Sequence, residues 1–291
     1  MNEVKTPERW AFDITLILNK TLGQDHFPID VPLVAREYSR HRFPEASLTA
    51  VVGDNLPGFE GALYPAPDRK QGWGIFYNRN IVSPGRINFT LAHEFGHYLI
   101  HRTKYPKGIQ CSDQDVIRWD SEYGQIEHQV NVFAANLLMP LDDFRRQIPG
   151  RSRIDLEIIG LCAERYNVSL IAAILRWLQY TLRRAVLVVS RDGYILWARS
   201  SEPALVSGAF FRTSAGPIEI PEKSLAAQSG RLGERRASDD LPADVWFREP
   251  CHETVVMSDR FDLTISLLQL GGEPASSLFH GNEPAEDAVR S

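Results

Sequence analysis

Apolar residues recur at helical spacing in two stretches near the N-terminus. They are Trp10, Ile14, Ile17 and Leu18 in the first stretch, and Val34, Ala35 and Tyr38 in the second. Residues spaced in this way share one face of a helix, which can then pack on a core. Pro28 and Pro32 lie between the two stretches, so the pattern predicts two separate helices within residues 8–42.

The pattern changes between residues 43 and 82, where glycines separate short β-prone runs. The runs are Leu48–Val52, Gly61–Leu63 and Gly74–Tyr77. Short runs bounded by turn residues are typical of strands, so we expect a small antiparallel sheet here. An edge strand of such a sheet is able to accept an extended peptide by strand addition.

Two largely apolar helices are predicted next. Residues 89–101 are mostly apolar, and between 122 and 140 apolar residues recur at helical spacing up to Pro140, which ends the helix. Gly96 lies inside the first helix and costs about 1 kcal/mol there relative to alanine, which indicates that another element packs close to it. Residues 102–121 are polar and read as a loop.

Residues 141–184 are predicted to be helical and are locally basic. One helix ends at Arg165, Asn167 supplies a turn, and Ser169 caps a second helix, which together have the shape of a helix-turn-helix. The second helix is mostly Leu, Ile, Ala and Trp, with Arg176 and Gln179 as its obvious polar residues. A helix that reads DNA normally offers polar side chains to the groove. Packing or protein contact and DNA contact are therefore both open for this segment.

Residues 185–272 form a further predicted α+β domain without a catalytic motif. Asp192-Gly193 predicts a hairpin turn between strands 185–190 and 194–198. Three later β-prone runs are Val245–Phe247, Glu253–Met257 and Leu263–Leu270. Residues 273–291 have the composition of a flexible tail. The resulting division is 1–140, 141–184, 185–272 and the tail 273–291.

Composition and charge limit the possible classes of function. The 291 residues carry a net charge of −5, which does not favour bulk electrostatic binding to nucleic acid. No run approaches the about 18 apolar residues of a membrane span, and the first residues lack the pattern of a signal peptide. Three scattered cysteines, Cys111, Cys162 and Cys251, cannot form a disulfide framework. We expect a cytoplasmic protein with no membrane partner.

The candidate chemistry lies in the first apolar helix, which contains His93-Glu94-x-x-His97. On a helix His93 and His97 share one face, so both imidazoles can reach one metal ion. In the chemistry of this motif the glutamate accepts a proton from the water that the metal activates, and later donates one to the leaving amine. Glu94 is therefore the predicted catalytic residue.

A catalytic zinc needs a third protein ligand, and the sequence offers four candidates. These are Glu122, Glu127, His128 and His101. We favour Glu127, which lies in the first turn of the helix over residues 122–140, beside its apolar stripe. Glu122 is the second choice, while His101 is expected to be a hydrogen-bonding residue at the helix end. Two histidines and a glutamate suit zinc, although manganese or iron is possible in the same site.

Two blocks resemble the ImmA/IrrE family of zinc-peptidase-like proteins. They are Phe89-Thr90-Leu91-Ala92-His93-Glu94-Phe95-Gly96-His97-Tyr98-Leu99-Ile100-His101 and Glu127-x-x-Val130-Asn131-x-Phe133-Ala134-Ala135-x-Leu137-Leu138-Met139-Pro140. The second block resembles the family's E-x-x-A-N-x-F-A-x-x-L-L-M-P, with Val130 where alanine is usual. The resemblance covers about residues 45–180. With its added C-terminal domain the chain is most similar to the family's radiation-response regulators, whose last domain resembles a GAF sensor fold.

The resemblance implies an α+β protein with a zincin-like (gluzincin-like) peptidase domain, a helix-turn-helix-like middle segment and a GAF-like last domain. It implies that Glu127 is the third ligand, and that the protein cuts a helix-turn-helix repressor after a stress signal such as radiation or DNA damage. The alternative is a non-enzymatic regulator that binds DNA or protein through residues 141–184 and senses an unknown small molecule with its last domain. The intact Glu94 favours the enzyme, because a purely structural metal site does not need it.

Overall fold

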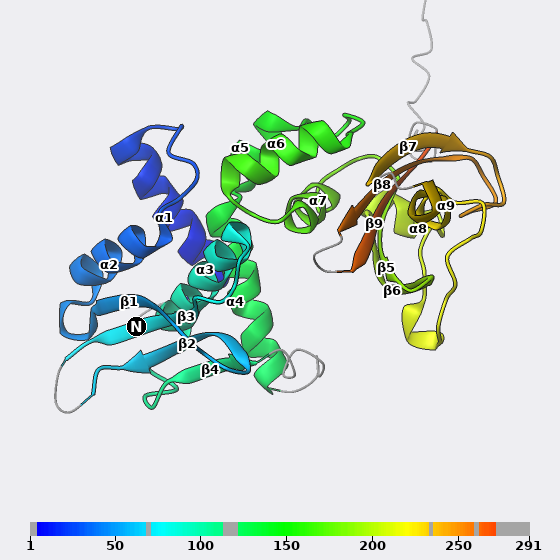
Figure 1. Cartoon of the computed structure of the whole chain (residues 1–291). Coiled ribbons are helices and arrows are strands. Elements are labelled where there is room, and N and C mark those ends of the chain that lie inside the picture. Colours follow the sequence, from blue (N-terminus) through cyan, green and yellow to red (C-terminus); the bar gives the residue numbers. More distant parts are fainter. Residues whose placement is uncertain (1–4, 68–70, 113–121, 233–234, 259–261, 272–291) are drawn as a thin grey trace, which may run out of the picture. The chain divides into compact units, whose positions relative to one another are not determined.

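The computed structural model describes residues 5–67, 71–112, 122–232, 235–258 and 262–271 (Figure 1). Its contacts divide the chain into two compact units. The first unit contains residues 1–149 and 154–177, and the second contains residues 150–153 and 178–291. The segment 141–184, predicted to be helical, therefore contributes most of its residues to the first unit.

The first unit begins with two helices that confirm the N-terminal prediction. They are α1 (Pro7–Leu22) and α2 (Val31–Arg42), followed by a short 3-10 turn, η1 (Pro44–Ala46). Thr6 and Asp30 cap the helices, and each side chain accepts a hydrogen bond from a backbone N–H in the first turn. Pro32 lies within the first turn of α2 rather than in the break, because a proline there gives up no helical hydrogen bond.

A four-stranded sheet follows, and its topology differs from the prediction. Its strands are β1 (Leu48–Asp54), β2 (Phe59–Pro65), β3 (Trp73–Asn78) and β4 (Ile109–Ser112), in the order β1-β3-β2-β4. β2 pairs antiparallel with β3 and β4, but β1 and β3 are parallel, so the prediction of an antiparallel sheet is wrong for that pair. β4 lies within the segment predicted to be a loop, since four residues are too few for a clear alternation. The edges of this sheet are β1 and β4.

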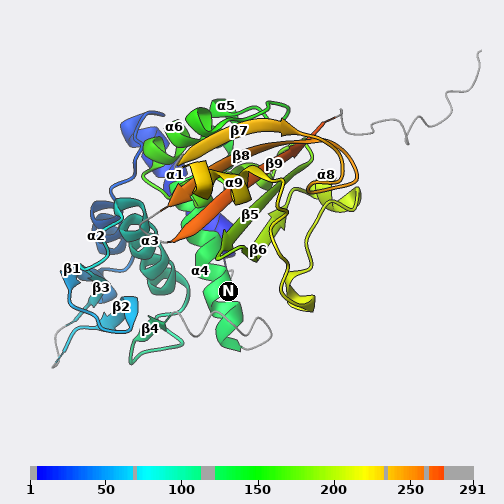
Figure 2. The same ribbon diagram turned by 45° about the vertical axis from the view of Figure 1, so that its right-hand side comes forward.

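The central helix of the unit is α3 (Pro84–Ile100), which carries the histidine motif. It packs against β2 and β3, while α4 (Glu122–Leu138) packs against both α3 and α1 (Figures 1 and 2). A Cβ added to Gly96 would lie 3.0 Å from Cδ1 of Phe133 and 3.1 Å from Cβ of Val130. This close approach of α4 confirms that another element packs against Gly96.

Three shorter helices complete the unit: α5 (Leu141–Gln147), α6 (Leu156–Tyr166) and α7 (Leu170–Leu178). Asn167 adopts a left-handed conformation (φ 48°) at the end of α6, and Ser169 Oγ accepts a hydrogen bond from the Ala172 N–H at 3.1 Å, so both predicted turn residues are confirmed. The pair α6 and α7 is bent by 106°. In the described part of the chain no single helix is long and apolar enough to cross a membrane, and only this bent pair reaches that length and hydropathy when counted together.

Arg176 of α7 does not have the exposure that a DNA-reading residue needs. Only 2% of its surface is exposed. Its Nε donates to the Met139 carbonyl at 2.7 Å, and its Nη2 donates to Asn136 Oδ1 at 2.9 Å. The guanidinium thus satisfies a carbonyl at the end of α4, which is a structural role. DNA contact through residues 141–184 would have to use other side chains.

A buried carboxylate ties α5 to α6. Asp143 accepts hydrogen bonds from Tyr166 Oη at 2.7 Å, Arg165 Nε at 3.1 Å and Arg146 Nη2 at 2.8 Å. Burial alone would raise the pKa of Asp143, but these three donors outweigh burial and hold the pKa below its usual value. The ionised form is therefore the one that stabilises this helix pair.

We expect Asp143→Asn to lower the free energy of unfolding at pH 7 by about 2 kcal/mol, since hydrogen bonds to a charged group are lost. A lowered carboxyl pKa contributes stability above the unfolded value of about 3.9, and this stability is lost as pH falls through the folded pKa. The difference between variant and wild type should thus shrink below about pH 4. Urea unfolding at pH 7 and pH 3.5 measures it. Asp142→Asn, at a side chain that is 66% exposed, is the control and should change little; equal effects of both substitutions would contradict the argument.

The second unit is built on a five-stranded antiparallel sheet. Its strands are β5 (Ala185–Arg191), β6 (Tyr194–Ser200), β7 (Arg236–Leu241), β8 (Cys251–Ser258) and β9 (Leu263–Leu270), in the order β6-β5-β9-β8-β7. The hairpin at Asp192-Gly193 is confirmed, with φ 50° and 80° at these residues. Helices α8 (Glu202–Val206) and α9 (Leu225–Leu232) and the 3-10 turn η3 (Thr213–Ala215) lie in the connections.

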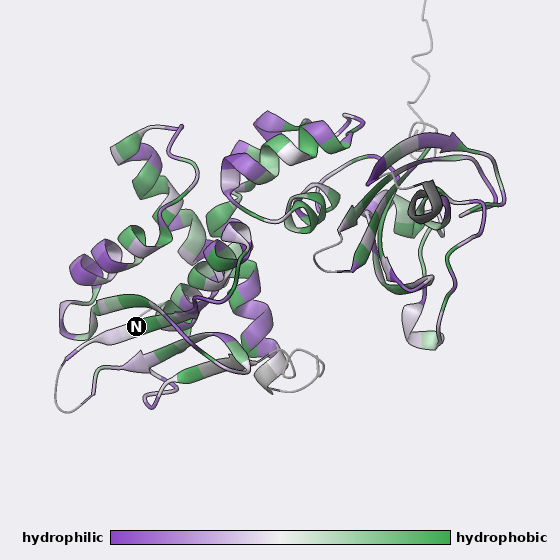
Figure 3. Cartoon of the chain, in the orientation of Figure 1, coloured by the Kyte–Doolittle hydropathy of each residue, from purple (hydrophilic) through white to green (hydrophobic). Residues whose placement is uncertain are grey.

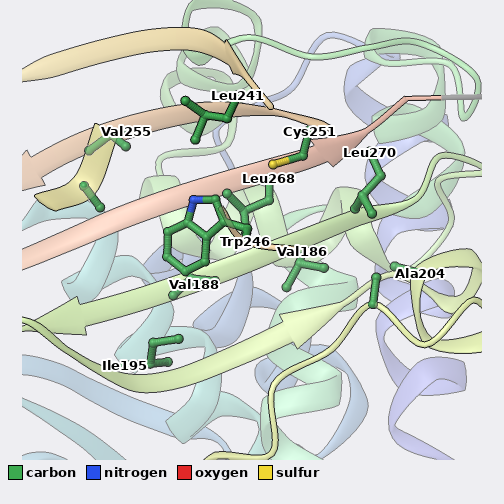
Figure 4. Close-up of a cluster of buried hydrophobic side chains, with 12 residues drawn as sticks. Val186, Val188, Ile195, Ala204, Leu241, Trp246, Cys251, Val255, Leu268 and Leu270 are labelled. Atoms are coloured by element: carbon green, nitrogen blue, oxygen red, sulfur yellow. The ribbon is translucent and has the colours of Figure 1, made fainter. Parts of the chain in front are cut away.

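One strand prediction for the second unit is wrong, and one strand was not predicted. Val245–Phe247 is not a strand, but Trp246 is buried and packs with Val188, Leu241 and Leu268 in the core of this unit (Figure 4). The run was predicted to be a strand because it is apolar, but its apolar residues are explained by their contact with the core and not by a strand conformation. β7 escaped prediction because its residues are mostly hydrophilic (Figure 3), as suits an edge strand. The tail 273–291 lies outside the described residues.

Candidate metal centre

Helix α3 brings two imidazoles together at the centre of the first unit. His93 and His97 are 8% and 0% exposed. Their Nε2 atoms lie 3.2 Å apart, as the i, i+4 spacing on one helix face predicts. Ser83 begins the helix by accepting a hydrogen bond from the Arg86 N–H, and apolar neighbours bury its middle turns.

Helix α4 supplies the third side chain, Glu127. Its Oε2 lies 3.1 Å from His93 Nε2, and its Oε1 lies 3.3 Å from His97 Nε2. α4 begins at Glu122, so Glu127 lies in the second turn and not the first. The ligand atoms of His93, His97 and Glu127 all lie within 4.8 Å of one another, and all three side chains are buried. We call these three residues the metal triad.

The structure separates the other candidate ligands from this centre in different ways. His101 is buried, but its Nδ1 faces His97 Nδ1 and not the ligand atom Nε2. His128 is exposed on α4. The side chain of Glu122 lies outside the described residues. Of the four candidates, Glu127 is the one that the described structure brings to both histidines.

The spacing of the donor atoms fits a small tetrahedral cation. Zinc bonds to nitrogen and oxygen ligands are about 2.0–2.2 Å long, so neighbouring ligands of a tetrahedral ion lie about 3.3–3.5 Å apart. The two Nε2 atoms lie 3.2 Å apart, and each lies 3.1 or 3.3 Å from one of the two oxygens of Glu127, so all these separations are close to that spacing. Two imidazole nitrogens and a carboxylate are also the donor set of many catalytic zinc sites. The residues present therefore fit a metal ion of this kind.

Glu94 lies beside the metal triad on the side of the sheet. It is completely buried, and a Cβ added to Gly61 of β2 would lie 2.5 Å from its Oε1 and 2.9 Å from its Cγ. Only a residue without a side chain at position 61 leaves room for this carboxylate. The neighbouring residue Glu60 of β2 forms an ion pair with Arg86 of α3, which links β2 to the helix that carries the motif.

Burial and hydrogen bonding set the charge of the metal triad. Burial lowers the pKa of His97 to about 4, which leaves its imidazole neutral at pH 7. Burial would lower the pKa of His93 too, but the adjacent carboxylates of Glu127 and Glu94 outweigh it and raise that pKa. Burial would raise the pKa of Glu127, yet the adjacent imidazoles of His93 and His97 hold that pKa well below the usual range. The centre thus combines an ionised carboxylate with imidazole donors, as a divalent cation requires.

Two amide side chains of α4 lie behind the histidines of the metal triad, one in direct contact with His93 and one linked to His97 through His101. Asn131 Oδ1 lies 3.0 Å from His93 Nδ1. On the other side, His97 Nδ1 lies 3.1 Å from His101 Nδ1, and His101 Nε2 lies 3.0 Å from Gln129 Oε1. Reading the sequence identified neither amide as part of the site. Asn131 lies one helical turn from Glu127, and this spacing is the signal that could have found it, whereas Gln129 has no such spacing.

A buried donor set of two histidines and a glutamate, with a second glutamate next to it on the motif helix, defines a metallopeptidase-like centre. The comparison with known families agrees with this class. Residues 50–178 match the family model Peptidase_M78, described as the IrrE N-terminal-like domain. The predicted resemblance over about residues 45–180 is confirmed for this part of the chain. The match includes the sheet and α3 to α7, and leaves α1, α2 and the strands of the second unit outside it. A search of curated proteins found no match to the chain.

Proposed function

We propose that this protein is a metal-dependent, site-specific endopeptidase. The observation that carries the proposal is the convergence of His93, His97 and Glu127 beside the buried carboxylate of Glu94. The match of residues 50–178 to a peptidase family model supports the same class. A metal held there by the metal triad would polarise the scissile carbonyl and make a water molecule acidic enough to attack at neutral pH.

The residues of the chain supply the remaining chemistry. Glu94 accepts the proton of the attacking water and donates it to the nitrogen of the leaving amine. Its burial between α3 and β2 keeps the carboxylate in place and away from bulk water. Zinc is the metal we propose, with manganese or iron as alternatives that the same donors accept.

The substrate we propose is a helix-turn-helix transcriptional repressor, whose cleavage switches on a response to stress such as radiation or DNA damage. In this proposal an extended segment of that substrate pairs with β4, an edge strand of the described sheet, because β4 pairs with β2 at the level of Gly61, which contacts Glu94. In this proposal the second unit is a GAF-like sensor domain. Its antiparallel sheet with its own core is consistent with a separate sensing domain, whose small-molecule ligand is not identified.

The test is a cleavage assay with purified components. The protein is incubated with repressors of the helix-turn-helix class encoded beside it, with zinc or manganese added, and the products are identified by mass spectrometry. We expect a single cut that disappears in a chelated sample and in the Glu94→Gln variant. Cleavage that persists in both samples would refute the proposed mechanism.

The alternative is a non-enzymatic regulator that binds DNA or protein through its helix-turn-helix-like segment. It is favoured by the 106° bend between α6 and α7, which lies in the range of about 90–120° found in such motifs. The burial of Arg176 counts against DNA reading by α7. No cleavage with any metal, together with promoter binding that persists after metal removal, would favour this alternative.

A further inference from the structure

The further inference concerns the hydrogen bonds behind the metal triad, and it rests on the proposed metal site. Each histidine of the triad has one ring nitrogen directed at the other ligands, and its second ring nitrogen meets a side chain outside the triad. A histidine can bind a metal through Nε2 only when the proton of the neutral ring lies on Nδ1. What faces Nδ1 therefore determines whether each histidine is ready to bind.

For His93 the answer is direct. The atom facing its Nδ1 is the amide oxygen of Asn131, at 3.0 Å. An amide oxygen accepts hydrogen bonds and cannot donate one. The proton of His93 therefore lies on Nδ1, and Nε2 presents its lone pair to the metal.

For His97 the same result is reached through a second imidazole. Gln129 Oε1 lies 3.0 Å from His101 Nε2, and since this oxygen only accepts, the proton of His101 lies on Nε2. His101 Nδ1 is then an acceptor, and it faces His97 Nδ1 at 3.1 Å. His97 must donate from Nδ1, which places the lone pair of the neutral ring on Nε2, the nitrogen that faces His93 and Glu127.

We propose that His101 and Gln129 are positioning residues that hold His97 in the metal-binding tautomer. Neither of them is among the three grouped ligands. The amide oxygen of Gln129 makes His101 an acceptor for His97, just as the amide oxygen of Asn131 is itself the acceptor for His93. Both ligand histidines therefore carry their proton on Nδ1. The contacts that determine this join residues far apart in the sequence, His101 with Gln129 (28 positions) and His93 with Asn131 (38 positions).

Placement and burial support this role over simple packing. His101 lies just after the last residue of α3, one turn beyond His97, and is 4% exposed. Both of its ring nitrogens have hydrogen-bond partners, although an apolar side chain could fill the same space. Groups behind a metal ligand fix its orientation, and their loss typically weakens metal binding by about 10–100-fold.

The test compares two substitutions of the same shape in the full-length protein. His101→Asn keeps an acceptor, since Oδ1 is attached at the same carbon as Nδ1 of histidine. His101→Leu is nearly identical in shape but cannot accept a hydrogen bond. Zinc affinity is measured by competition with a chromophoric chelator, and the Co²⁺ absorption spectrum reports the ligand geometry.

We expect His101→Leu to weaken zinc binding by about 10–100-fold and to alter the Co²⁺ bands, while His101→Asn retains most of the affinity. Equal zinc affinities for the two variants would overturn the proposal and leave His101 a packing residue. Gln129→Leu is the second variant if His101→Leu fails to fold. We expect Gln129→Leu to weaken zinc binding to the same extent, and unchanged zinc affinity of this variant would also overturn the proposal.

Unfolding temperatures of the metal-free variants separate a positioning role from a packing role. If His101 only packs, its substitutions should lower the unfolding temperature, and His101→Asn should bind zinc no better than His101→Leu. The readout also separates this inference from the proposed function. Zinc affinity is measured without any peptide, so a failure to cleave repressors leaves the positioning role of His101 intact, and the absence of that role leaves the peptidase proposal to be tested by Glu94.

Discussion

Replacing Glu94 with glutamine is expected to lower the rate of peptide cleavage by about 10²–10⁴-fold, the range that a positioned general acid–base contributes. The amide keeps the shape of the carboxylate but cannot accept the proton of the attacking water. Zinc affinity should stay close to the wild-type value, since Glu94 is not one of the three grouped ligands. Cleavage kinetics and chelator competition on the same preparation measure both quantities. Wild-type cleavage by Glu94→Gln would exclude Glu94 as the proton carrier.

A second variant tests the same carboxylate without changing it chemically. In Gly61→Ala the new Cβ would lie 2.5 Å from Glu94 Oε1 and 2.8 Å from Thr90 Cγ2, so the glutamate side chain has to move. We expect a clear loss of cleavage with retained zinc binding, because none of the three atoms nearest to the new Cβ belongs to the metal triad. Gly58→Ala, at a position with no neighbour within 4 Å of the added Cβ but with φ 89°, is the control for a local glycine effect in the same region. Equal losses in both variants would point to strain and not to Glu94.

The sequence contained the motif helix in full, and the reason is local. His93, Glu94 and His97 lie within five residues, and helical geometry alone places both imidazoles on one face. The third ligand required tertiary structure, because Glu127 reaches the histidines only after α4 packs against Gly96. Its choice over Glu122, His101 and His128 depended on the apolar stripe and on the family resemblance.

The parts that escaped prediction depend on partners far along the chain. Short β-prone runs identified β1, β2 and β3 but carry no information on strand direction, so the parallel pairing of β1 and β3 was missed. Arg176 was a candidate for DNA contact because its charge is visible in the sequence, while its acceptor, the Met139 carbonyl, lies just after the end of α4. Gln129 likewise looked like an ordinary polar residue of α4, since its contact with His101 exists only in the fold.

The polar site residues lie between two largely apolar helices, α3 and α4, and one physical rule explains how they can be buried there. A buried polar group is costly unless it is hydrogen-bonded. His93, His97, Glu127 and His101 are all less than 9% exposed, and each contacts another of these residues or an amide of α4. Several titratable residues within an otherwise apolar helix pattern are thus the sequence signal of this centre. Their hydrogen-bond partners cannot be identified until the fold is known.

The identity of the third ligand gives the other large expected effect. We expect Glu127→Gln to weaken zinc binding by more than about 100-fold, because a directly binding carboxylate should cost more than the 10–100-fold typical of outer groups. The amide preserves the shape of the side chain but removes the negative charge beside His93 and His97. Chelator competition at pH 7 measures the loss.

The matched control is the neighbouring residue on α4. His128 is exposed and was a candidate ligand from the sequence, so His128→Ala should leave zinc affinity unchanged if Glu127 is the ligand. Glu122→Gln completes the comparison among the acidic candidates. Loss of zinc in either of these variants, with retention in Glu127→Gln, would assign the third position differently. Since Glu127 Oε1 and Oε2 each face one histidine, we expect the loss to be confined to Glu127→Gln.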